Sequence, residues 1–581
     1  MRVSESMMGK AIVGRRWVWV GLLLSLCGCM ARFDPDAMQP RAVIEAPPIY
    51  GRHTVGQTFI SRRPGLSAIE VAWQAAPDLH GPLILRLRAH PAGDELAQAT
   101  LDPAQHQDRA MLRWDFAPVS ESQDISFYFE IEAPEAVADD PLRLYAADHD
   151  VYALGSAYAD GASRANDLTF RTYYTYSPAL LGQDVLKGLA RSWLLFPALA
   201  LFWAPGALLL WLWPERQRRL YISGGWERVS FALGLSLAVL PLSLLWITQV
   251  GGKLTPVIAR ILFGGLGLAA LGLIAGPEIK AKITNVKSQM ARGELGLANF
   301  QIRRLLRDLL HPNLQLGLIL LVGLIVRLLA VRDLAFPAWV DAVHHTLLAR
   351  IIAESGRIPV TYMPYVPVET ATYHFGFHAC AAFFAWLSGG SMPQVVLWLG
   401  QLFNAAMALQ VYAFARWLTK SRRAGRFAAL CVALVGTMPA YYVSWGRYTQ
   451  LTGLLIMPIA VMLSVTAIER RDRRAALLSL LTLAGLIATH YRVFAFYVGF
   501  IAAWWLVSAL SDLRAWRKHL SALGYSVLLT ALAMLLLMPW LGQAARHLWF
   551  KAMQQWGKAA PATYWDFSWR YVSADFDRYL L

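Results

Sequence analysis

The chain has 581 residues, of which 56% are hydrophobic, and carries a formal net charge of +16 with a mean hydropathy of +0.40. Long apolar runs separated by short basic links exclude a soluble enzyme and predict a polytopic membrane protein. The positive charge does not indicate a nucleic acid partner, because Lys and Arg gather in those links, where they orient helices in a bilayer.

The first 31 residues are typical of a targeting segment. Arg15 and Arg16 precede an apolar stretch, Trp17–Ala31, which is short for a membrane crossing but suits a signal peptide or signal anchor. Leu26-Cys27-Gly28-Cys29 also resembles a lipoprotein processing site, with Cys29 as the residue that would be acylated. Either interpretation predicts export of the segment that follows. The cysteine pattern implies no disulfide framework.

Residues 50–176 alternate between apolar and polar side chains, as in Leu83–Arg88 and Phe127–Glu132. Alternation with a period of two predicts half-buried strands, and the turn-rich links between them favour an antiparallel β-sandwich. Gly56–Phe59 followed by Gly65–Val71 resembles the jelly-roll modules of many carbohydrate-binding domains. A carbohydrate-binding sandwich and a purely structural one are both open at this point.

After Pro178 the sequence predicts about ten transmembrane helices. They lie near 189–213, 229–250, 256–274, 316–330, 395–417, 427–442, 451–468, 477–489, 493–510 and 520–541. We group them as N-terminal helices at 189–275 and a core at 316–541, joined by a basic link at 278–312. The positive-inside rule places the basic links in the cytoplasm and the sandwich on the extracytoplasmic side.

Two segments need a separate interpretation. The apolar run between His374 and Gly390 fits the alternation of the basic links only as a re-entrant or partial helix. The aromatic tail at 542–581 is either an outer-face segment or the end of a truncated reading frame.

Polar residues that interrupt the apolar pattern converge on the extracytoplasmic side, in an outer loop at 333–373 and at nearby helix ends. These are Asp341, His344, His345, Tyr362, Tyr365, Tyr373, His374, His378, Arg447, Tyr448, Gln450, His490 and Arg492. Titratable groups beside membrane spans are costly and mark functional sites. A single helix-end histidine is more often structural, so the prediction of a site rests on the convergence of independent segments.

The segment that carries Asp341 has the pattern of an amphipathic helix at the membrane interface. Pro337 predicts its start and Gly356 its end. Asp341, His344 and His345 have i, i+3 and i+4 spacing and are predicted to share one face. The opposite face is predicted to consist of Val340, Val343, Leu347 and Ile351. A solvated face usually carries Lys and Glu, so Asp and His favour function.

Residues 316–541 resemble the GT-C superfamily of integral membrane glycosyltransferases. In that superfamily a first core helix leads into an outer loop with an early acidic residue, and Asp341 matches that position. Gly356–Tyr365 is similar to the later extended, proline-rich part of that loop. Two features depart from the pattern: Ala342 stands where many relatives carry a second acid, and no Lys-Pro-Pro element precedes the helix that begins at Tyr373.

The resemblance implies transfer of a sugar from a polyprenyl-phosphate donor to a glycan, lipid or protein acceptor at the outer face of a bacterial inner membrane. Asp341 would be the general base, Arg447 and Arg492 would bind phosphate, and the tyrosines would stack on sugar. His344 and His345 have three open roles: a second base, hydrogen-bond donors to the phosphate, or ligands of a divalent metal with Asp341 and His374.

Two other classes of function stay open on the sequence. A transporter or flippase for lipid-linked saccharides would use Asp341 and the histidines for proton coupling. A non-catalytic scaffold with a degenerate GT-C fold would explain Ala342. The sequence identifies neither the sugar, the acceptor nor the oligomeric state.

Overall fold

The computed structural model describes residues 34–75, 79–107, 110–215, 222, 224–276, 283–285, 287–288, 312–332, 334–366 and 371–555. The predicted targeting segment, most of the basic link at 278–312 and the tail beyond residue 555 lie outside the described residues. The chain divides into two compact units between Asp184 and Val185.

The first unit consists of antiparallel strands. They are β1 (Asp34–Gln39), β2 (Ile44–Glu45), β3 (Val55–Ser61), β4 (Leu66–Ala72), β5 (Leu83–Arg88), β6 (Glu95–Leu101), β7 (Met111–Val119), β8 (Ile125–Glu132), β9 (Tyr145–Ala146), β10 (Ala157–Ala159), β11 (Ala162–Ser163) and β12 (Phe170–Tyr174). One sheet has the order β1-β12-β4-β7, and another has the order β11-β10-β3-β8-β5-β6. The orders β1-β12-β4-β7 and β3-β8-β5-β6 are those of an eight-stranded jelly roll.

The core of this unit lies between the two large sheets. Along β5 the leucines are buried while the intervening residues are partly exposed, as period-two alternation predicts. Phe59 of β3 and Phe129 of β8 meet Phe170 of β12 from the other sheet, with ring centroids 6.1 and 5.8 Å apart. The predicted N-terminal β-sheet region is confirmed, although its first strand begins at Asp34 rather than near residue 50.

The second unit is helical. Its helices are α2 (Pro178–Ala190), α3 (Leu195–Phe202), α4 (Ala204–Trp211), α6 (Gly225–Gln249), α7 (Pro256–Ala270), α10 (Pro312–Leu329), α11 (Val340–Ser355), α12 (Gly376–Ser388), α13 (Met392–Thr419), α14 (Arg422–Leu430), α15 (Ala440–Ser444), α16 (Tyr448–Arg470), α17 (Arg473–Thr489), α18 (Tyr491–Ser511), α19 (Trp516–Leu536) and α20 (Met538–Gln555). The α2 helix begins before the unit boundary at Val185.

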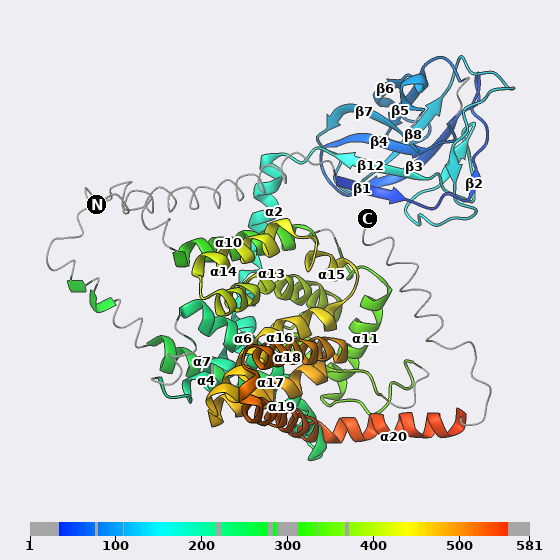
Figure 1. Cartoon of the computed structure of the whole chain (residues 1–581). Helices are drawn as coiled ribbons and strands as arrows, with labels where there is room; N and C mark the ends of the chain where they lie inside the picture. The colour runs from blue at the N-terminus through cyan, green and yellow to red at the C-terminus, as the bar shows by residue number, and fades with distance from the viewer. Residues whose placement is uncertain are drawn as a thin grey trace. The chain divides into compact units, whose positions relative to one another are not determined.

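Among the described residues, nine helices are long and apolar enough to cross a membrane. The most buried of these are α16, α13 and α6, which lie at the centre of the helical unit (Figure 1). The first candidate span covers Pro178–Phe202 rather than 189–213, because the helix breaks at Trp203 and a new one starts with Pro205 in its first turn. The predicted span at 477–489 forms α17, which has 17 residues and is not among the nine.

The apolar run between His374 and Gly390 forms α12, which has 13 residues. At 1.5 Å per residue it is about 20 Å long, shorter than the ~30 Å hydrocarbon core of a bilayer. The Phe375 N–H donates to the Ala488 carbonyl near the end of α17 (3.0 Å), and the Trp386 indole donates to the Ala353 carbonyl in α11 (3.0 Å). Both ends of α12 are thus held by neighbouring segments, and its length favours a partial helix.

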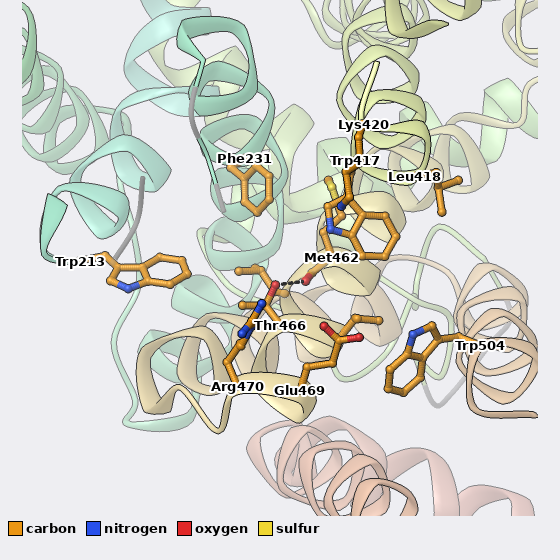
Figure 2. A pocket seen from close by; sticks show the side chains of 12 residues that line it. Trp213, Phe231, Trp417, Leu418, Lys420, Met462, Thr466, Glu469, Arg470 and Trp504 are labelled. Carbon is orange, nitrogen blue, oxygen red and sulfur yellow. Dashed lines mark hydrogen bonds between the residues drawn. The ribbon is translucent and has the colours of Figure 1, made fainter. Parts of the chain in front are cut away.

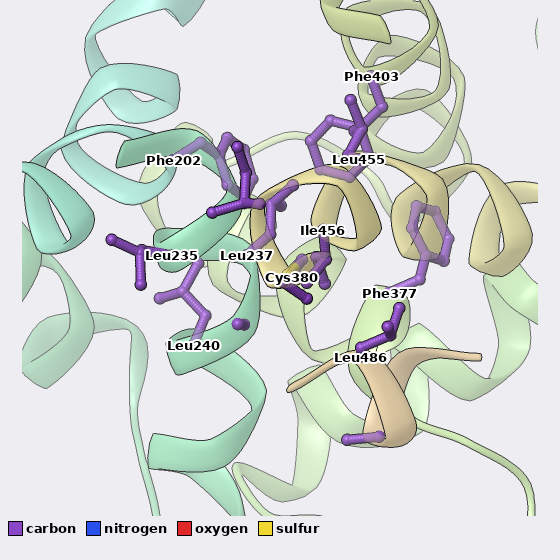
Figure 3. Close-up of a cluster of buried hydrophobic side chains, with 14 of the residues drawn as sticks. Phe202, Leu235, Leu237, Leu240, Phe377, Cys380, Phe403, Leu455, Ile456 and Leu486 are labelled. Atoms are coloured by element: carbon purple, nitrogen blue, oxygen red, sulfur yellow. The ribbon is translucent and has the colours of Figure 1, made fainter. Parts of the chain in front are cut away.

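The α12 helix lies inside the apolar core of the helical unit. Figure 3 shows Phe377 and Cys380 of α12 among side chains from several other helices, including Leu237 of α6 and Ile456 of α16. Cys380 is completely buried. Because the core fixes α12 in place, it also fixes the polar residues in the first turn of α12.

Candidate functional site

An ion pair joins Asp341 in the first turn of α11 to Arg447 at the start of α16. Arg447 Nη1 lies 2.9 Å from Asp341 Oδ2, and the two side chains are 37% and 38% exposed. The Arg447 guanidinium also lies over the Trp445 ring, 4.6 Å from its centroid. Both charges therefore remain accessible to a polar molecule while protein contacts hold them in place.

Gly446 allows α11 and α16 to approach each other at this pair. Its φ of +65° is a backbone conformation that favours glycine. A Cβ atom at this position would lie 3.1 Å from the Asp341 Cβ and 3.1 Å from the Ala342 nitrogen. The conformation of Gly446 thus positions the residue that follows it, Arg447, beside Asp341.

A buried histidine pair links α11 to α12. His345 Nδ1 lies 2.9 Å from His378 Nε2, and both side chains are almost completely buried. Burial lowers the pKa of His345 to about 4, although the nearby Asp341 carboxylate raises it in part. His345 is therefore neutral near pH 7 and can donate or accept a single proton in this contact.

Next to this pair, His374 belongs to a cluster of stacked rings. The Tyr373 and His374 rings stack 3.9 Å apart, and the His490 ring from the start of α18 lies 4.8 Å from His374. Burial lowers the pKa of both imidazoles, to about 4 for His490. His374 Nε2 is buried and has no hydrogen-bond partner within the described part of the chain. An unsatisfied buried nitrogen of this kind is available to a polar ligand.

Of the other predicted site residues, some are buried next to this cluster and others are exposed. Tyr448 is buried against Phe377, with the rings stacked 5.4 Å apart, and Tyr362 is buried near Tyr373. Arg492 is exposed and lies 5.8 Å from the Tyr491 ring centroid. His344 and Tyr365 are exposed, and Gln450 is partly buried. The structure gives Tyr365 no ring contact with the cluster.

The predicted division of α11 into a polar and an apolar face is wrong. Its buried face consists of Ala342, His345, Thr346, Ala349 and Ile352, whereas the Val343 side chain is 52% exposed. His345 is buried because α12 supplies a polar partner for it, and small alanines allow the two helices to pack closely. The predicted end of the helix is confirmed, since Gly356 caps it in the left-handed conformation.

The residues proposed as metal ligands do not converge. No group of three or more His, Cys, Asp or Glu side chains among the described residues is placed to hold a metal ion. His345 contacts His378, and Asp341 contacts Arg447.

A pocket of about 300 Å³ adjoins the site and was not predicted from the sequence. Its lining includes Arg327 of α10, Gln401 of α13, and Tyr441, Ser444 and Tyr448 on either side of the α15–α16 link. Arg327 donates to Asn404 Oδ1 (3.2 Å) and to the Ala433 carbonyl (3.0 Å). An arginine inside the apolar segment 316–330 is the signal that could have indicated this pocket.

Comparison with known proteins identifies the helical unit. A family model described as "Family of unknown function (DUF6541)" matches residues 199–572, more than half of the chain and all of the site residues. No curated protein matches the chain.

Proposed function

We propose that this chain, which belongs to the family of unknown function DUF6541, is an integral membrane glycosyltransferase. The proposal rests on the residues of its site. The proposed reaction transfers a sugar from a polyprenyl-phosphate donor to a glycan, lipid or protein acceptor. We place the reaction and the jelly-roll unit on the extracytoplasmic side of a bacterial inner membrane.

The observation that carries this proposal is the half-exposed Asp341–Arg447 pair. Glycosyl transfer from a lipid phosphate needs a base for the acceptor hydroxyl and a cation for the departing phosphate. Here a carboxylate and a guanidinium are held 2.9 Å apart at a surface that the substrate can reach. The adjacent tyrosines and histidines provide ring faces and hydrogen-bonding groups for the sugar.

In the proposed mechanism, the donor phosphate binds Arg447 and so weakens its attraction to Asp341. Asp341 then accepts the proton of the acceptor hydroxyl, whose oxygen forms a bond to the anomeric carbon of the sugar. The bond between that carbon and the phosphate oxygen breaks, and its electron pair stays on the phosphate. Arg447 and the exposed Arg492 stabilise the negative charge that develops there.

The pocket beside the site suits the lipid part of the donor. It combines apolar residues such as Leu334 and Leu397 with Arg327, and its lining extends to Ser444 and Tyr448 on either side of Arg447. We propose that the first isoprene units occupy this pocket while the phosphate faces Arg447.

The distribution of basic residues supports the proposed side of the membrane. Lys420, Arg470 and Arg471 lie at the ends of α13 and α16, whereas Arg447 lies at the opposite end of α16. The positive-inside rule assigns the first three to the cytoplasm and hence the site to the other side.

The proposal is tested with the purified full-length protein, polyprenyl-phosphate-linked sugars and an envelope acceptor fraction, by measuring release of free polyprenyl phosphate. We expect Asp341→Asn to lower the rate about 10²- to 10⁴-fold, since it removes the base, and Asp341→Glu to retain part of it. Glu354→Gln, an exposed change on the same helix, is the matched control. Full activity of Asp341→Asn would exclude the proposed base.

A flippase or transporter is the second candidate, because the buried His345–His378 pair could carry a proton between α11 and α12. This function predicts movement of a fluorescent polyprenyl-phosphate sugar across proteoliposomes without cleavage of the donor. His345→Gln would slow that movement, whereas release of polyprenyl phosphate in the same vesicles would favour the transferase.

A further inference from the structure

The end of the helical unit that lies far from Asp341 contains a second pocket, with a volume of about 500 Å³. It is formed where α13 and α16 end, and it is also lined by Trp213 after α4 and Trp504 of α18. Figure 2 shows Trp417 and Lys420 on one side of it and Glu469 and Arg470 on another. At 1.5 Å per residue, Arg470 at the end of the 23-residue α16 helix is about 35 Å from Arg447, and Met462, where the pocket lining on this helix begins, is about 22 Å from it.

The pocket is lined by both aromatic and aliphatic side chains and by charged ones. Three tryptophans, Trp213, Trp417 and Trp504, line it together with aliphatic side chains such as Met462 and Val465. The Thr466 hydroxyl donates to the Met462 carbonyl of its own helix at 2.7 Å, so its proton is not available to a ligand in the pocket. Trp417 lies near the end of α13, a position typical of tryptophans at the lipid headgroup level.

Two cations lie at the mouth of the pocket. Lys420 ends α13 in a left-handed conformation, with its ammonium 5.4 Å from the Trp417 ring centroid, and Arg470 lies in the last turn of α16. Across the part of the chain that the structure describes, neither cation forms an ion pair with a carboxylate. With Glu469 as the only acidic residue among those lining it, the pocket carries a net charge of +1.

We propose that this pocket binds an anionic phospholipid of the cytoplasmic leaflet. The phosphate lies between Lys420 and Arg470, and the acyl chains extend along the tryptophans and Met462. Basic pockets between membrane helices on the cytoplasmic side recognise such headgroups. A soluble phosphate would use the cations but not the tryptophans and aliphatic side chains beside them, so the combined lining favours a lipid.

This inference goes beyond the proposed reaction and depends on the helices spanning a membrane with this end on the cytoplasmic side. Lipid binding is measured without any sugar donor or acceptor. A failure of the glycosyltransferase proposal therefore leaves the lipid test unaffected, and the reverse also holds.

The test uses the full-length protein in detergent, titrated with phosphatidylglycerol or phosphatidylcholine and examined by native mass spectrometry. We expect phosphatidylglycerol to bind more tightly and the double variant Lys420→Gln, Arg470→Gln to lose about 25-fold in affinity, at about five-fold for each cation removed. The matched control is Arg423→Gln, Arg473→Gln, which removes the same charge from exposed positions on the same two links.

Three results would overturn the proposal. One is unchanged binding in the pocket variant, and another is an equal loss in the control, which would indicate general attraction to a basic surface. The third is competition by inorganic phosphate or glycerol phosphate as strong as that by the lipid, which would indicate a soluble anion. Thermal unfolding of both double variants verifies that they remain folded, and Trp417→Ala tests the aromatic wall without changing charge.

Discussion

Each of the two units contains an Asp–Arg pair of almost the same length, but in very different surroundings. In the β-sheet unit, Arg63 Nη1 lies 3.0 Å from Asp184 Oδ1, and the side chains are only 8% and 3% exposed. In the helical unit, Arg447 and Asp341 lie 2.9 Å apart and are more than a third exposed. The Asp184 carboxylate also accepts a hydrogen bond from the Tyr176 hydroxyl (3.0 Å).

The difference shows that exposure, rather than contact geometry, separates a structural pair from a candidate site. Two buried charges are not hydrated and are stabilised mainly by each other, so removal of one leaves the other buried without a compensating charge. A half-exposed pair keeps part of its hydration, so a substrate phosphate can replace one partner at small cost. The Asp341–Arg447 pair has the surroundings that exchange with a substrate requires.

The largest expected effect is therefore in the β-sheet unit. Arg63→Ala should destabilise the packing around Asp184 by about 3–5 kcal/mol, because a buried carboxylate loses its partner. Hydrogen exchange of the full-length protein, followed in peptides from residues 176–190, measures this change. Arg143→Ala is the control, because it breaks an exposed pair with Glu45 of 2.9 Å. A loss of stability below about 1 kcal/mol for Arg63→Ala would contradict the distinction between the buried and the exposed pair.

Acid should destabilise the protein through the buried imidazole of His345. Burial lowers the pKa of His345 from 6.5 to about 4, so the unfolded chain binds more protons between these values. The stability contributed by neutral His345 is complete above pH 6.5 and is lost as the pH falls toward 4. The loss at pH 4 is on the order of 3 kcal/mol.

Thermal unfolding between pH 7.5 and pH 4 measures this dependence. His345→Gln should unfold with a weaker dependence on pH than the native protein, because it removes one of the groups that must be protonated. His344→Gln, which changes an exposed imidazole on the same turn, is the matched variant. Identical pH profiles for the native protein and His345→Gln would contradict the assignment of His345 as a buried neutral group.

A smaller effect is expected where the backbone brings the exposed pair together. Gly446→Ala should cost about 1–2 kcal/mol, because alanine is strained at a positive φ, and should also displace Asp341. Gly389→Ala is the control, since Gly389 has a φ of +68° but no atom within 4 Å of an added Cβ. Both variants carry the conformational cost, so any additional loss in stability or transfer rate for Gly446→Ala reports the contact with Asp341.

Local pattern predicted most of the elements but not the contacts between them. The alternation in Leu83–Arg88 and the terminating Gly356 act over a few residues, and both predictions are confirmed. The buried face of α11 could not be derived in this way, because His345 is paired with His378, 33 residues further along the chain. An assignment of faces from the spacing within one helix assumes that a histidine is polar and exposed. A hydrogen-bonding partner from another helix allows the histidine to be buried.

The candidate site shows the same limit. Polar residues at helix ends predicted that Asp341 and Arg447 share one side of the membrane, but not that they form a pair. That pair depends on Gly446, whose position between Trp445 and Arg447 at a helix start was the available signal. The break at Trp203 and the pocket around Arg327 likewise depend on packing between segments that are far apart in the sequence.

The smallest expected effect on stability is for the pair in the candidate site itself. Arg447→Gln should change the free energy of unfolding by less than about 1 kcal/mol, because water replaces much of what the half-exposed Asp341 loses. The same variant should slow transfer at least about 10²-fold, since the phosphate loses its cation. Thermal unfolding and polyprenyl phosphate release, measured on one preparation, give both quantities. If Arg447→Gln destabilised the protein as much as Arg63→Ala, the Asp341–Arg447 pair would be structural, and the site would lose the observation on which its proposed function rests.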